Sequence, residues 1–368
     1  MKISDYYTYA PKSKIKAGDA NPNGKYQFYT SSPDESRRCD EYLYDCKAIV
    51  MGTGGSATLH YYDGKFSTST DCLTLIPNEK IRAKYLYYFF LANMDVLEAG
   101  FKGAGLKHTS KGYIDNIEIT KIPSLPSQDK IVNLFDELAL RIEKERRQIE
   151  KLDELVKARF VEMFGGIDLA PQNKEWTKIS DIGEVVSGST PKTSIKEYWN
   201  GNICWITPAE LSNMSGIIYD SKKKITERGK SSCSLRMMPS RTVILSSRAP
   251  IGKVALLGKE MCCNQGFKNI ICNEKVAPEY LYYLLGYNTI FLNSLGRGAT
   301  FKEISKKIVG EIKVPLPAKE LQNQFAVFTR QVDKSKFVLS NELTMCDFYI
   351  RLIHDRVMHS CINLRVTQ

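Results

Sequence analysis

The sequence predicts a mixed α/β (α+β) protein, in which two tandem globular domains are joined by two long helices that form an antiparallel coiled coil. Three observations support this fold: an internal repeat, short strand-and-turn segments in each repeat, and a long helical pattern at the end of each repeat. A chain of 368 residues is long enough for two ordinary domains. We place the first domain at 1–126, the central helix at 127–166, the second domain at 167–317 and the C-terminal helix at 318–368.

The repeat is visible in aligned segments that keep their order along the chain. NEKIRAKYLYYFF (78–90) matches NEKVAPEYLYYLL (273–285) at an offset of 195 residues. KGAGLKHTSKGYI (102–114) matches RGATFKEISKKIV (297–309) at the same offset, and the segments that follow match with a small insertion. A constant offset over such a distance indicates a tandem duplication.

Each repeat ends in an amphipathic helical pattern. In the first helix, apolar residues recur at spacings of four and three over 131–163, with Ser127 as N-cap and Gly165 as the stop. About 37 residues at ~1.5 Å each give a rod of roughly 55 Å. The second helix has a similar but less regular stripe over 321–357. Neither stripe is covered within its own segment, so we expect the helices to bury each other. The alternative, in which each helix packs on its own domain, stays open.

Composition narrows the class of partner. The formal net charge of +11 favours a polyanion, with nucleic acid first and a membrane surface second. The chain has no run of 18 apolar residues, and its N-terminal sequence MKISDYYTYAPKSK lacks the apolar core of a signal peptide. The ten cysteines include no C-x-x-C pair. We therefore expect a cytoplasmic protein without a disulfide framework.

The usual catalytic and cofactor patterns are missing. No G-x-x-x-x-G-K-[ST] phosphate loop occurs, and GTGGSA (52–57) is followed by a strand-like segment where a dinucleotide site needs a helix. The four histidines do not have metal-ligand spacing. The sequence predicts no catalytic residue, no cofactor and no metal.

One enzymatic alternative remains open. Asp34, Asp45 and Lys47 resemble the P-D…D-x-K arrangement of metal-dependent nucleases, in which carboxylates hold Mg²⁺ and a lysine assists an attacking water. Asp34 lies in a run of turn-forming residues, and the second repeat has no carboxylate at the D-x-K position. A short pattern of this kind arises often by chance.

Ten loops, five in each repeat, share another composition, rich in hydroxyls, amides, basic side chains and glycine. Hydroxyl, lysine and backbone N–H groups contact phosphates, whereas arginine and amide side chains pair with base edges. Ordinary turn chemistry explains any one of these loops, but ten such loops on a basic chain favour DNA binding. The candidates in the first repeat are Lys12, Lys14, Lys16, Thr30, Ser31, Ser32, Thr53, Gly54, Ser67, Thr68, Lys107 and His108. Those in the second repeat are Ser189, Thr190, Lys192, Thr207, Ser246, Ser247, Arg248, Asn264, Gln265, Arg297, Thr300 and Lys302.

These segments resemble a known family. WTKISDIGEVVSGSTPKT (176–193), YWNGNICWITPAEL (198–211) and SSRAPIGKVAL (246–256) are similar to the specificity subunit of type I restriction–modification enzymes. GTGGSATLHYYDGKFSTSTDC (52–72) resembles another recognition-domain variant of that family, and PSLPSQDKIVNLFDEL (123–138) resembles its central spacer helix. The resemblance covers nearly the whole chain.

The resemblance implies a non-catalytic protein that recognises DNA. Each of two target-recognition domains would read one half of a bipartite site in double-stranded DNA, and the two helices would set the half-site separation. The pseudo-twofold symmetry would admit two methyltransferase subunits, and restriction–translocase subunits would complete the nuclease. Methylation and cleavage would belong to these partners. The partner-binding candidates on the central helix are Arg141, Glu145, Arg146 and Lys151.

Two readings other than DNA recognition are kept for comparison. One is the nuclease based on Asp34, Asp45 and Lys47. The other is a coiled-coil scaffold whose positive charge is incidental. A subunit that switches DNA specificity without a dedicated nuclease is a variant of the leading interpretation.

Overall fold

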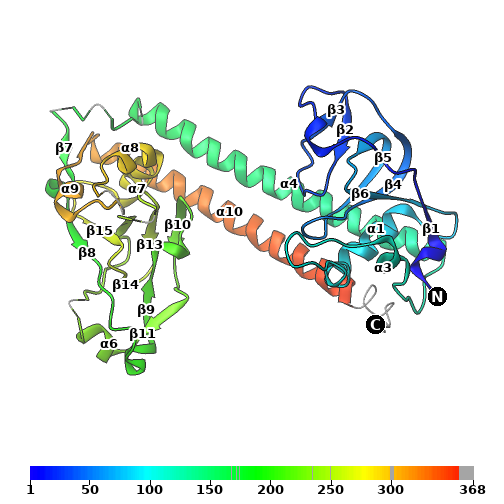
Figure 1. Cartoon of the computed structure of the whole chain (residues 1–368). Helices are drawn as coiled ribbons and strands as arrows, with labels where there is room; N and C mark the ends of the chain where they lie inside the picture. The colour runs from blue at the N-terminus through cyan, green and yellow to red at the C-terminus, as the bar shows by residue number, and fades with distance from the viewer. Residues whose placement is uncertain are drawn as a thin grey trace. The chain divides into compact units, whose positions relative to one another are not determined.

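A computed structural model gives the fold of the chain in two compact units (Figure 1). Unit 1 comprises Met1–Arg147 and Leu339–Gln368, and unit 2 comprises Gln148–Val338. Each unit contains part of both long helices. This division into two units does not test the four domains expected from the sequence, which stay a prediction. The structure describes residues 1–166, 168–170, 172–173, 175–233, 235–248, 250–298 and 302–355.

Unit 1 is built on a six-stranded sheet with the strand order β1-β6-β4-β5-β2-β3. β2 pairs with β5 in parallel, and the other strand pairs are antiparallel. The strands are β1 (Tyr7–Tyr9), β2 (Tyr26–Tyr29), β3 (Arg38–Cys39), β4 (Tyr44–Gly52), β5 (Leu59–Thr68) and β6 (Cys72–Pro77). The helices before the long one are η1 (Ile3–Tyr6), η2 (Ala17–Asp19), α1 (Ala83–Ala92), α2 (Met94–Ala99) and α3 (Lys111–Asp115).

Unit 2 contains sheets with the strand orders β10-β13-β12-β15-β8, β11-β9-β14 and β16-β7. Its strands are β7 (Thr177–Lys178), β8 (Gly183–Ser187), β9 (Trp199–Ile206), β10 (Met214–Ile218), β11 (Lys223–Ile225), β12 (Val243–Ser246), β13 (Val254–Leu257), β14 (Cys262–Cys263), β15 (Phe267–Cys272) and β16 (Lys313–Val314). Its short helices are α5 (Ile179–Ile182), η3 (Lys196–Tyr198), η4 (Pro208–Glu210), α6 (Glu227–Ser231), α7 (Pro278–Tyr287), α8 (Thr289–Ser294) and α9 (Lys306–Glu311).

The predicted repeat is confirmed by equivalent elements in the two units. Helices α1, α2 and α3 begin at Ala83, Met94 and Lys111, and α7, α8 and α9 each begin 195 residues later. In unit 1, β4 runs antiparallel to β5 and β6, as β12 does to β13 and β15 in unit 2. Helix α1 packs on β4–β6, and α7 packs on β12 and β13 (Figure 1). The two units differ in the other strands that surround this shared core. The loops that connect those strands therefore differ as well.

The two long helices, α4 (Leu125–Phe164) and α10 (Lys319–Ile353), pair within each unit. In unit 1, Arg141 of α4 lies 3.3 Å from Glu342 of α10. In unit 2, Lys336 of α10 forms an ion pair with Asp153 of α4. The early part of α4 thus meets the late part of α10, and the reverse holds in unit 2, so the pair is antiparallel as predicted. Each helix also packs on the sheet-bearing part of its unit, as in the alternative considered above.

A buried glutamine fastens each long helix to its unit. Gln128 accepts a hydrogen bond from the backbone N–H of Arg82 (2.7 Å), and Gln322 accepts one from the N–H of Ala277 (2.7 Å). Both glutamine side chains are fully buried. They satisfy backbone donors at the N-termini of α1 and α7, which have no partner within those helices.

We expect Gln322→Ala to destabilise unit 2 by about 1–3 kcal/mol, because the Ala277 N–H becomes a buried donor without an acceptor. Gln324→Ala, two positions along the same helix on its exposed side, is the control and should change stability little. Chemical denaturation of both variants measures the difference. Equal stabilities would show that the glutamine bond contributes nothing.

Candidate nucleic-acid interface

The five predicted loops of the first repeat converge in unit 1. We call residues 11–18, 29–32, 52–56, 67–71 and 102–110 loop cluster 1. The Thr53 N–H donates to the Asp71 carbonyl (2.8 Å), the Thr70 N–H to the Ile15 carbonyl (2.8 Å) and the Gly55 N–H to the Lys107 carbonyl (2.9 Å). Ser31 Oγ joins two loops, since it accepts from the Thr53 N–H (3.1 Å) and donates to the Asp71 carbonyl (2.5 Å).

Basic groups are prominent among the exposed residues of loop cluster 1, which also include Asp71 and Leu106. The side chains of Lys12, Lys14, Lys16, Lys107 and His108 are exposed, and Ser31, Ser32, Thr53 and Gly54 are partly exposed. Ammonium groups on short loops are suited to phosphate contacts.

Three predicted contacts in unit 1 are corrected by burial. Thr30, Ser67 and Thr68 are at most 3% exposed, so their hydroxyls do not reach a ligand on the surface. Ser67 Oγ instead donates to the Glu41 carbonyl (2.8 Å) and accepts from the Leu43 N–H (3.0 Å). A hydroxyl at a strand end serves the backbone as readily as a phosphate.

The five predicted loops of the second repeat also converge. We call residues 187–193, 204–211, 246–250, 264–267 and 297–304 loop cluster 2. The Gly188 N–H donates to the Phe267 carbonyl (3.4 Å), and the Asn264 N–H donates to the Ile206 carbonyl (2.9 Å). The Ser247 N–H donates to the Gly266 carbonyl (2.7 Å), and the Ser247 carbonyl accepts from the Ile304 N–H (3.0 Å). These backbone bonds hold all five segments together.

The predicted DNA contacts of Ser246 and Ser247 are corrected in the same way, because both side chains are fully buried. Ser246 Oγ donates to the Pro250 carbonyl (2.7 Å) and accepts from the Lys253 N–H (2.8 Å), which closes the turn. Ser247 Oγ donates to the Gly266 carbonyl (3.1 Å). The serines therefore shape the loop, and Arg248 is the partly exposed basic group that it presents.

The exposed surface of loop cluster 2 combines basic and amide groups. Asn264 Nδ2 donates to Thr190 Oγ1 (2.8 Å), and Thr190 Oγ1 also bonds to the exposed Gln265 amide. Lys192, Arg297 and Lys302 are exposed, and Ser189 and Thr207 are partly exposed. Thr300 lies outside the described residues. Such a mixture can contact both phosphates and base edges.

Sequence reasoning missed a buried ammonium beneath this loop cluster. Lys268 on β15 is 6% exposed, and its Nζ lies 3.0 Å from Glu303 Oε1 and 3.2 Å from Ser247 Oγ. The bond ties Glu303, whose backbone pairs with that of Arg297, to the central sheet. It also neutralises the Glu303 carboxylate, which would repel phosphate. In the sequence, Lys268 is a single lysine within an apolar strand pattern, and nothing in that pattern indicates that it pairs with Glu303.

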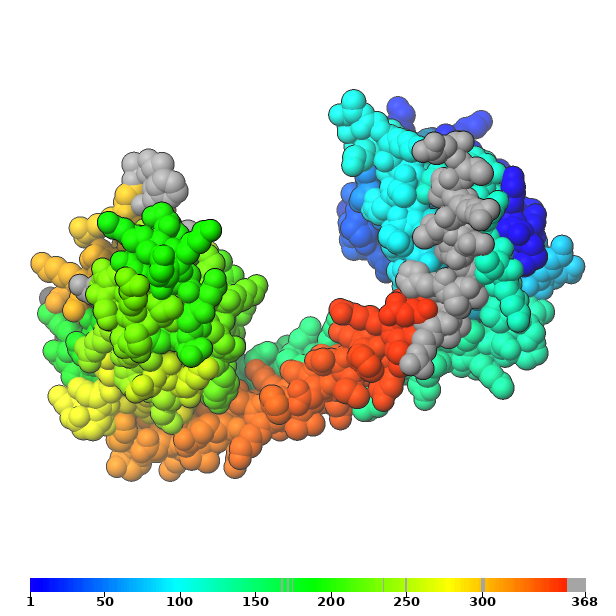
Figure 2. All heavy atoms as spheres, turned by 90° about the horizontal axis from the view of Figure 1, so that it is seen from below, coloured from blue at the N-terminus to red at the C-terminus, as the bar shows by residue number. Residues whose placement is uncertain are grey.

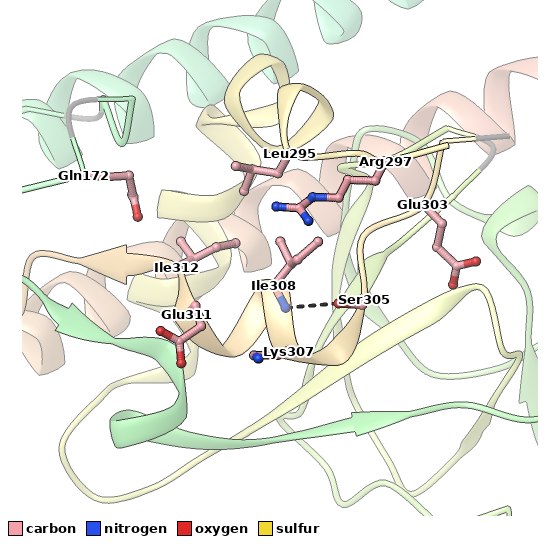
Figure 3. A pocket seen from close by; sticks show the side chains of 9 residues that line it. All are labelled: Gln172, Leu295, Arg297, Glu303, Ser305, Lys307, Ile308, Glu311 and Ile312. Atoms are coloured by element: carbon pink, nitrogen blue, oxygen red, sulfur yellow. Dashed lines mark hydrogen bonds between the residues drawn. The ribbon is translucent and has the colours of Figure 1, made fainter. Parts of the chain in front are cut away.

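A cavity of about 570 Å³ adjoins the bridge between Arg297 and Glu303 in loop cluster 2 (Figure 3). Arg297 extends toward Leu295 and Ile308, while Glu303 and Lys307 lie elsewhere on the lining. Ser305 caps α9 by accepting a hydrogen bond from the Ile308 N–H (3.2 Å). The cavity adds Lys307 to the basic groups near the interface.

The turn after Arg248 depends on Gly252. Its φ is +100°, and an added Cβ would lie 2.8 Å from Thr289 Cγ2 and 3.3 Å from Thr289 Cα. Its N–H donates to the Ser246 carbonyl (3.0 Å). An L side chain would therefore strain the backbone and press on α8.

We expect Gly252→Ala to destabilise unit 2 by about 1–2 kcal/mol or more through this backbone strain. Gly310→Ala is the control, since its Cβ would meet only Ser180 Cβ at an ordinary 3.6 Å. Thermal unfolding of the two variants tests the difference. Equal melting temperatures would contradict this account of the turn.

The predicted partner-binding residues on α4 divide into two groups. Arg141, Arg146 and Lys151 are exposed, and Arg141 also pairs with Glu342. Glu145 is only 6% exposed and lies on the buried seam of the helix pair, so its assignment to a partner is corrected. The apolar pattern of the helix is therefore interrupted at Glu145 by a buried carboxylate.

Sequence reasoning also missed a row of exposed apolar side chains on α10. In Figure 2 the side chains of α10, coloured orange to red, lie open on the viewed face. Exposed apolar patches are frequent at contacts between proteins. The row consists of Phe337, Val338, Met345, Phe348 and Tyr349, which are 46–67% exposed.

Two residues of the nuclease alternative have other partners in the structure. Asp34 accepts hydrogen bonds from the N–H and hydroxyl of Ser36, which hold its pKa below the usual range. Lys47 Nζ lies 3.4 Å from Asp63, a carboxylate outside the motif. Within the described part of the chain, no group of three or more His, Cys, Asp or Glu side chains is placed to hold a metal ion.

Two further findings concern the whole described chain. Among its residues, no helix combines the length and the apolar character needed to cross a membrane. The described cysteines are free thiols, and burial raises the pKa of Cys72 and Cys262 to about 11.

Comparisons with known proteins agree with this geometry. The family model described as type I restriction modification DNA specificity domain matches residues 1–154 and 171–344. The type I restriction enzyme MjaIX specificity subunit of Methanocaldococcus jannaschii is 43% identical over 184 residues, which make up 49% of this chain and 43% of that protein. The EcoR124I/EcoR124II specificity subunit of Escherichia coli is 24% identical over 302 residues, covering 76% of this chain and 69% of that protein.

The fold has a counterpart among solved structures. The crystal structure of a type I restriction–modification system S subunit from M. genitalium superposes with a TM-score of 0.68, covering 99% of this chain and 95% of that chain. Sequence identity is 17%, so this likeness concerns the fold.

Proposed function

Because the chain belongs to the type I restriction–modification DNA specificity family, we propose that it reads the DNA sequence for a type I restriction–modification complex. Loop cluster 1 contacts one half of a bipartite site in double-stranded DNA, and loop cluster 2 contacts the other half. The chain carries recognition, while methylation and cleavage belong to partner subunits.

The observation that carries this proposal is the convergence of five loops into one surface in each unit. Backbone hydrogen bonds hold the segments, and the hydroxyls of Ser31 and Ser247 satisfy backbone groups of the turns. The groups on the surface include basic and amide side chains, which are those that contact phosphates and base edges. The two clusters differ in sequence, so we propose that the half-sites differ as well.

The helices supply the second part of the function. The antiparallel pair of α4 and α10 sets the separation of the half-sites. We propose that two methyltransferase subunits dock on the helices, through the apolar row on α10 and exposed charges such as Arg146 and Lys151. Restriction–translocase subunits join through that complex. We place the assembly in the cytoplasm, where its DNA target lies.

Salt dependence of DNA binding tests the electrostatic part of the proposal. If about four phosphates are neutralised, a fourfold rise in salt should weaken binding about 100-fold. Fluorescence anisotropy with a labelled duplex, using the chain assembled with its methyltransferase, measures the slope. A scaffold with incidental charge would show no DNA binding, and that result would reject the proposal.

A further inference from the structure

A backbone bridge in loop cluster 1 closes a short loop with basic residues around it. The Lys102 N–H donates to the His108 carbonyl (3.0 Å), and the His108 N–H donates to the Lys102 carbonyl (3.0 Å). These two bonds close residues 103–107, which we call the bridged loop. The Thr109 N–H donates to the Thr53 carbonyl (3.0 Å), so the bridged loop is also fixed to its neighbour in loop cluster 1.

The bridged loop presents one large apolar side chain. Leu106 is 70% exposed, more than any other large apolar side chain among the described residues of unit 1. The three residues before it, Gly103, Ala104 and Gly105, are small, which lets the backbone approach a ligand closely. Residues 102–108 include lysine and histidine but no acidic side chain. Leu106 is therefore an apolar group on a loop that is otherwise suited to DNA.

The second repeat keeps the same bridge at the 195-residue offset. The Arg297 N–H donates to the Glu303 carbonyl (3.1 Å), and the Glu303 N–H donates to the Arg297 carbonyl (3.0 Å). The first residue inside each bridge is a glycine with positive φ, +147° in the first repeat and +123° at Gly298 in the second. The sequence position of Leu106 is taken by another apolar residue, Phe301, which lies outside the described residues.

This repetition separates Leu106 from the apolar residues that are scattered over any protein surface. Such residues occur singly and need no explanation. A large apolar residue at the same position of an equivalent loop in both repeats, within the set of loops that carries basic and amide groups, indicates a shared role toward the same kind of partner. That partner is DNA if the loop clusters read DNA.

We propose that Leu106 inserts between two stacked base pairs from the minor groove and bends the half-site that loop cluster 1 contacts. The inference rests on the proposed function and adds a residue that reads DNA by deforming it. Leucine and phenylalanine are among the side chains that wedge base steps apart, and the bent DNA then contacts more protein surface. The leucine gains by leaving water, while Lys102 and Lys107 contact nearby phosphates. Base steps that unstack easily are favoured, so Leu106 contributes specificity without a hydrogen bond to a base.

Variants of Leu106, in the chain assembled with its methyltransferase, test this proposal. The probe is a duplex that carries the motif methylated by the complex, with pairs of fluorescent dyes that report the bend at each half-site separately. We expect Leu106→Ala to reduce the bend at one half-site only and to weaken binding about tenfold. The slope of log affinity against log salt should stay unchanged, because leucine carries no charge. Leu106→Met should keep the bend, since methionine is also a wedge residue.

Two further variants separate a wedge from other roles. Lys107→Ala removes the adjacent charge and should lower the salt slope by about 0.9. Leu91→Ala on α1, an exposed leucine outside loop cluster 1, is the control and should change neither bend nor affinity.

The proposal is overturned if Leu106→Ala keeps the bends of the unmodified chain, or if it loses assembly with the methyltransferase, which would make Leu106 a protein contact. Binding of the duplex by the unmodified complex without any bend would reject the wedge and leave the proposed function standing. An unmodified complex that does not bind DNA would reject the proposed function itself.

Discussion

Replacing Phe160 by alanine is expected to lower the free energy of unfolding of unit 2 by about 3–5 kcal/mol. Phe160 of α4 is fully buried. Its ring stacks on Tyr280 of α7 (centroids 5.6 Å apart, interplanar angle 7°) and meets Phe325 of α10 edge-on (5.3 Å). One side chain thus joins both long helices to α7, so its removal leaves a cavity at their junction.

Tryptophan fluorescence during chemical denaturation measures this effect. All three tryptophans, Trp176, Trp199 and Trp205, belong to unit 2, so the signal reports that unit. Val161→Ala, the neighbouring position at 42% exposure, is the control and should cost far less. Similar losses in the two variants would show that the junction is not centred on Phe160.

Removing three basic groups from loop cluster 2 is expected to produce the largest effect on DNA binding. In the variant Arg248→Ala/Arg297→Ala/Lys302→Ala, affinity should fall by about 100-fold or more. The slope of log affinity against log salt should fall by about 2.7, at about 0.9 for each lost phosphate contact. The reason is that these three groups, of which Arg248 is partly exposed and the others are exposed, lie on loops that backbone hydrogen bonds bring together.

The control for this variant removes equal charge from another surface. Lys319, Arg330 and Lys334 lie on α10 and outside the loop cluster. Their triple alanine variant should keep the salt slope of the unmodified chain in anisotropy measurements. If both variants lose affinity and slope equally, net charge and not loop cluster 2 governs binding.

The periodic features of the fold were predictable from the sequence. The helices expected at 127–166 and 318–368 are α4 at Leu125–Phe164 and α10 at Lys319–Ile353, with the described residues ending at 355. An apolar stripe needs a long regular element to bury it, so spacing alone determines the assignment. The repeat was equally visible, because the two cores keep the same residue types at a constant offset.

The burial and the hydrogen-bond partners of individual hydroxyl and charged groups were not predictable from the sequence. Ser247 and Thr190 both occur in polar loops, yet the first is fully buried on the Gly266 carbonyl and the second is partly exposed. Only the tertiary arrangement decides whether a hydroxyl meets a backbone group or solvent. The same limit applies to Glu145 and Lys268, whose burial depends on partners distant in sequence or on a neighbouring helix.

Modified-base sequencing tests the central claim, that each loop cluster reads one half of a bipartite site, most directly. A host without other DNA methylation would express the methyltransferase subunit with the unmodified chain, or with the chain altered at Arg248, Gln265 and Arg297. We predict a methylated motif of two short blocks around a fixed gap, in which the altered chain changes or loses one block and keeps the other. A motif that does not depend on this chain, or two blocks that change together, would contradict the claim.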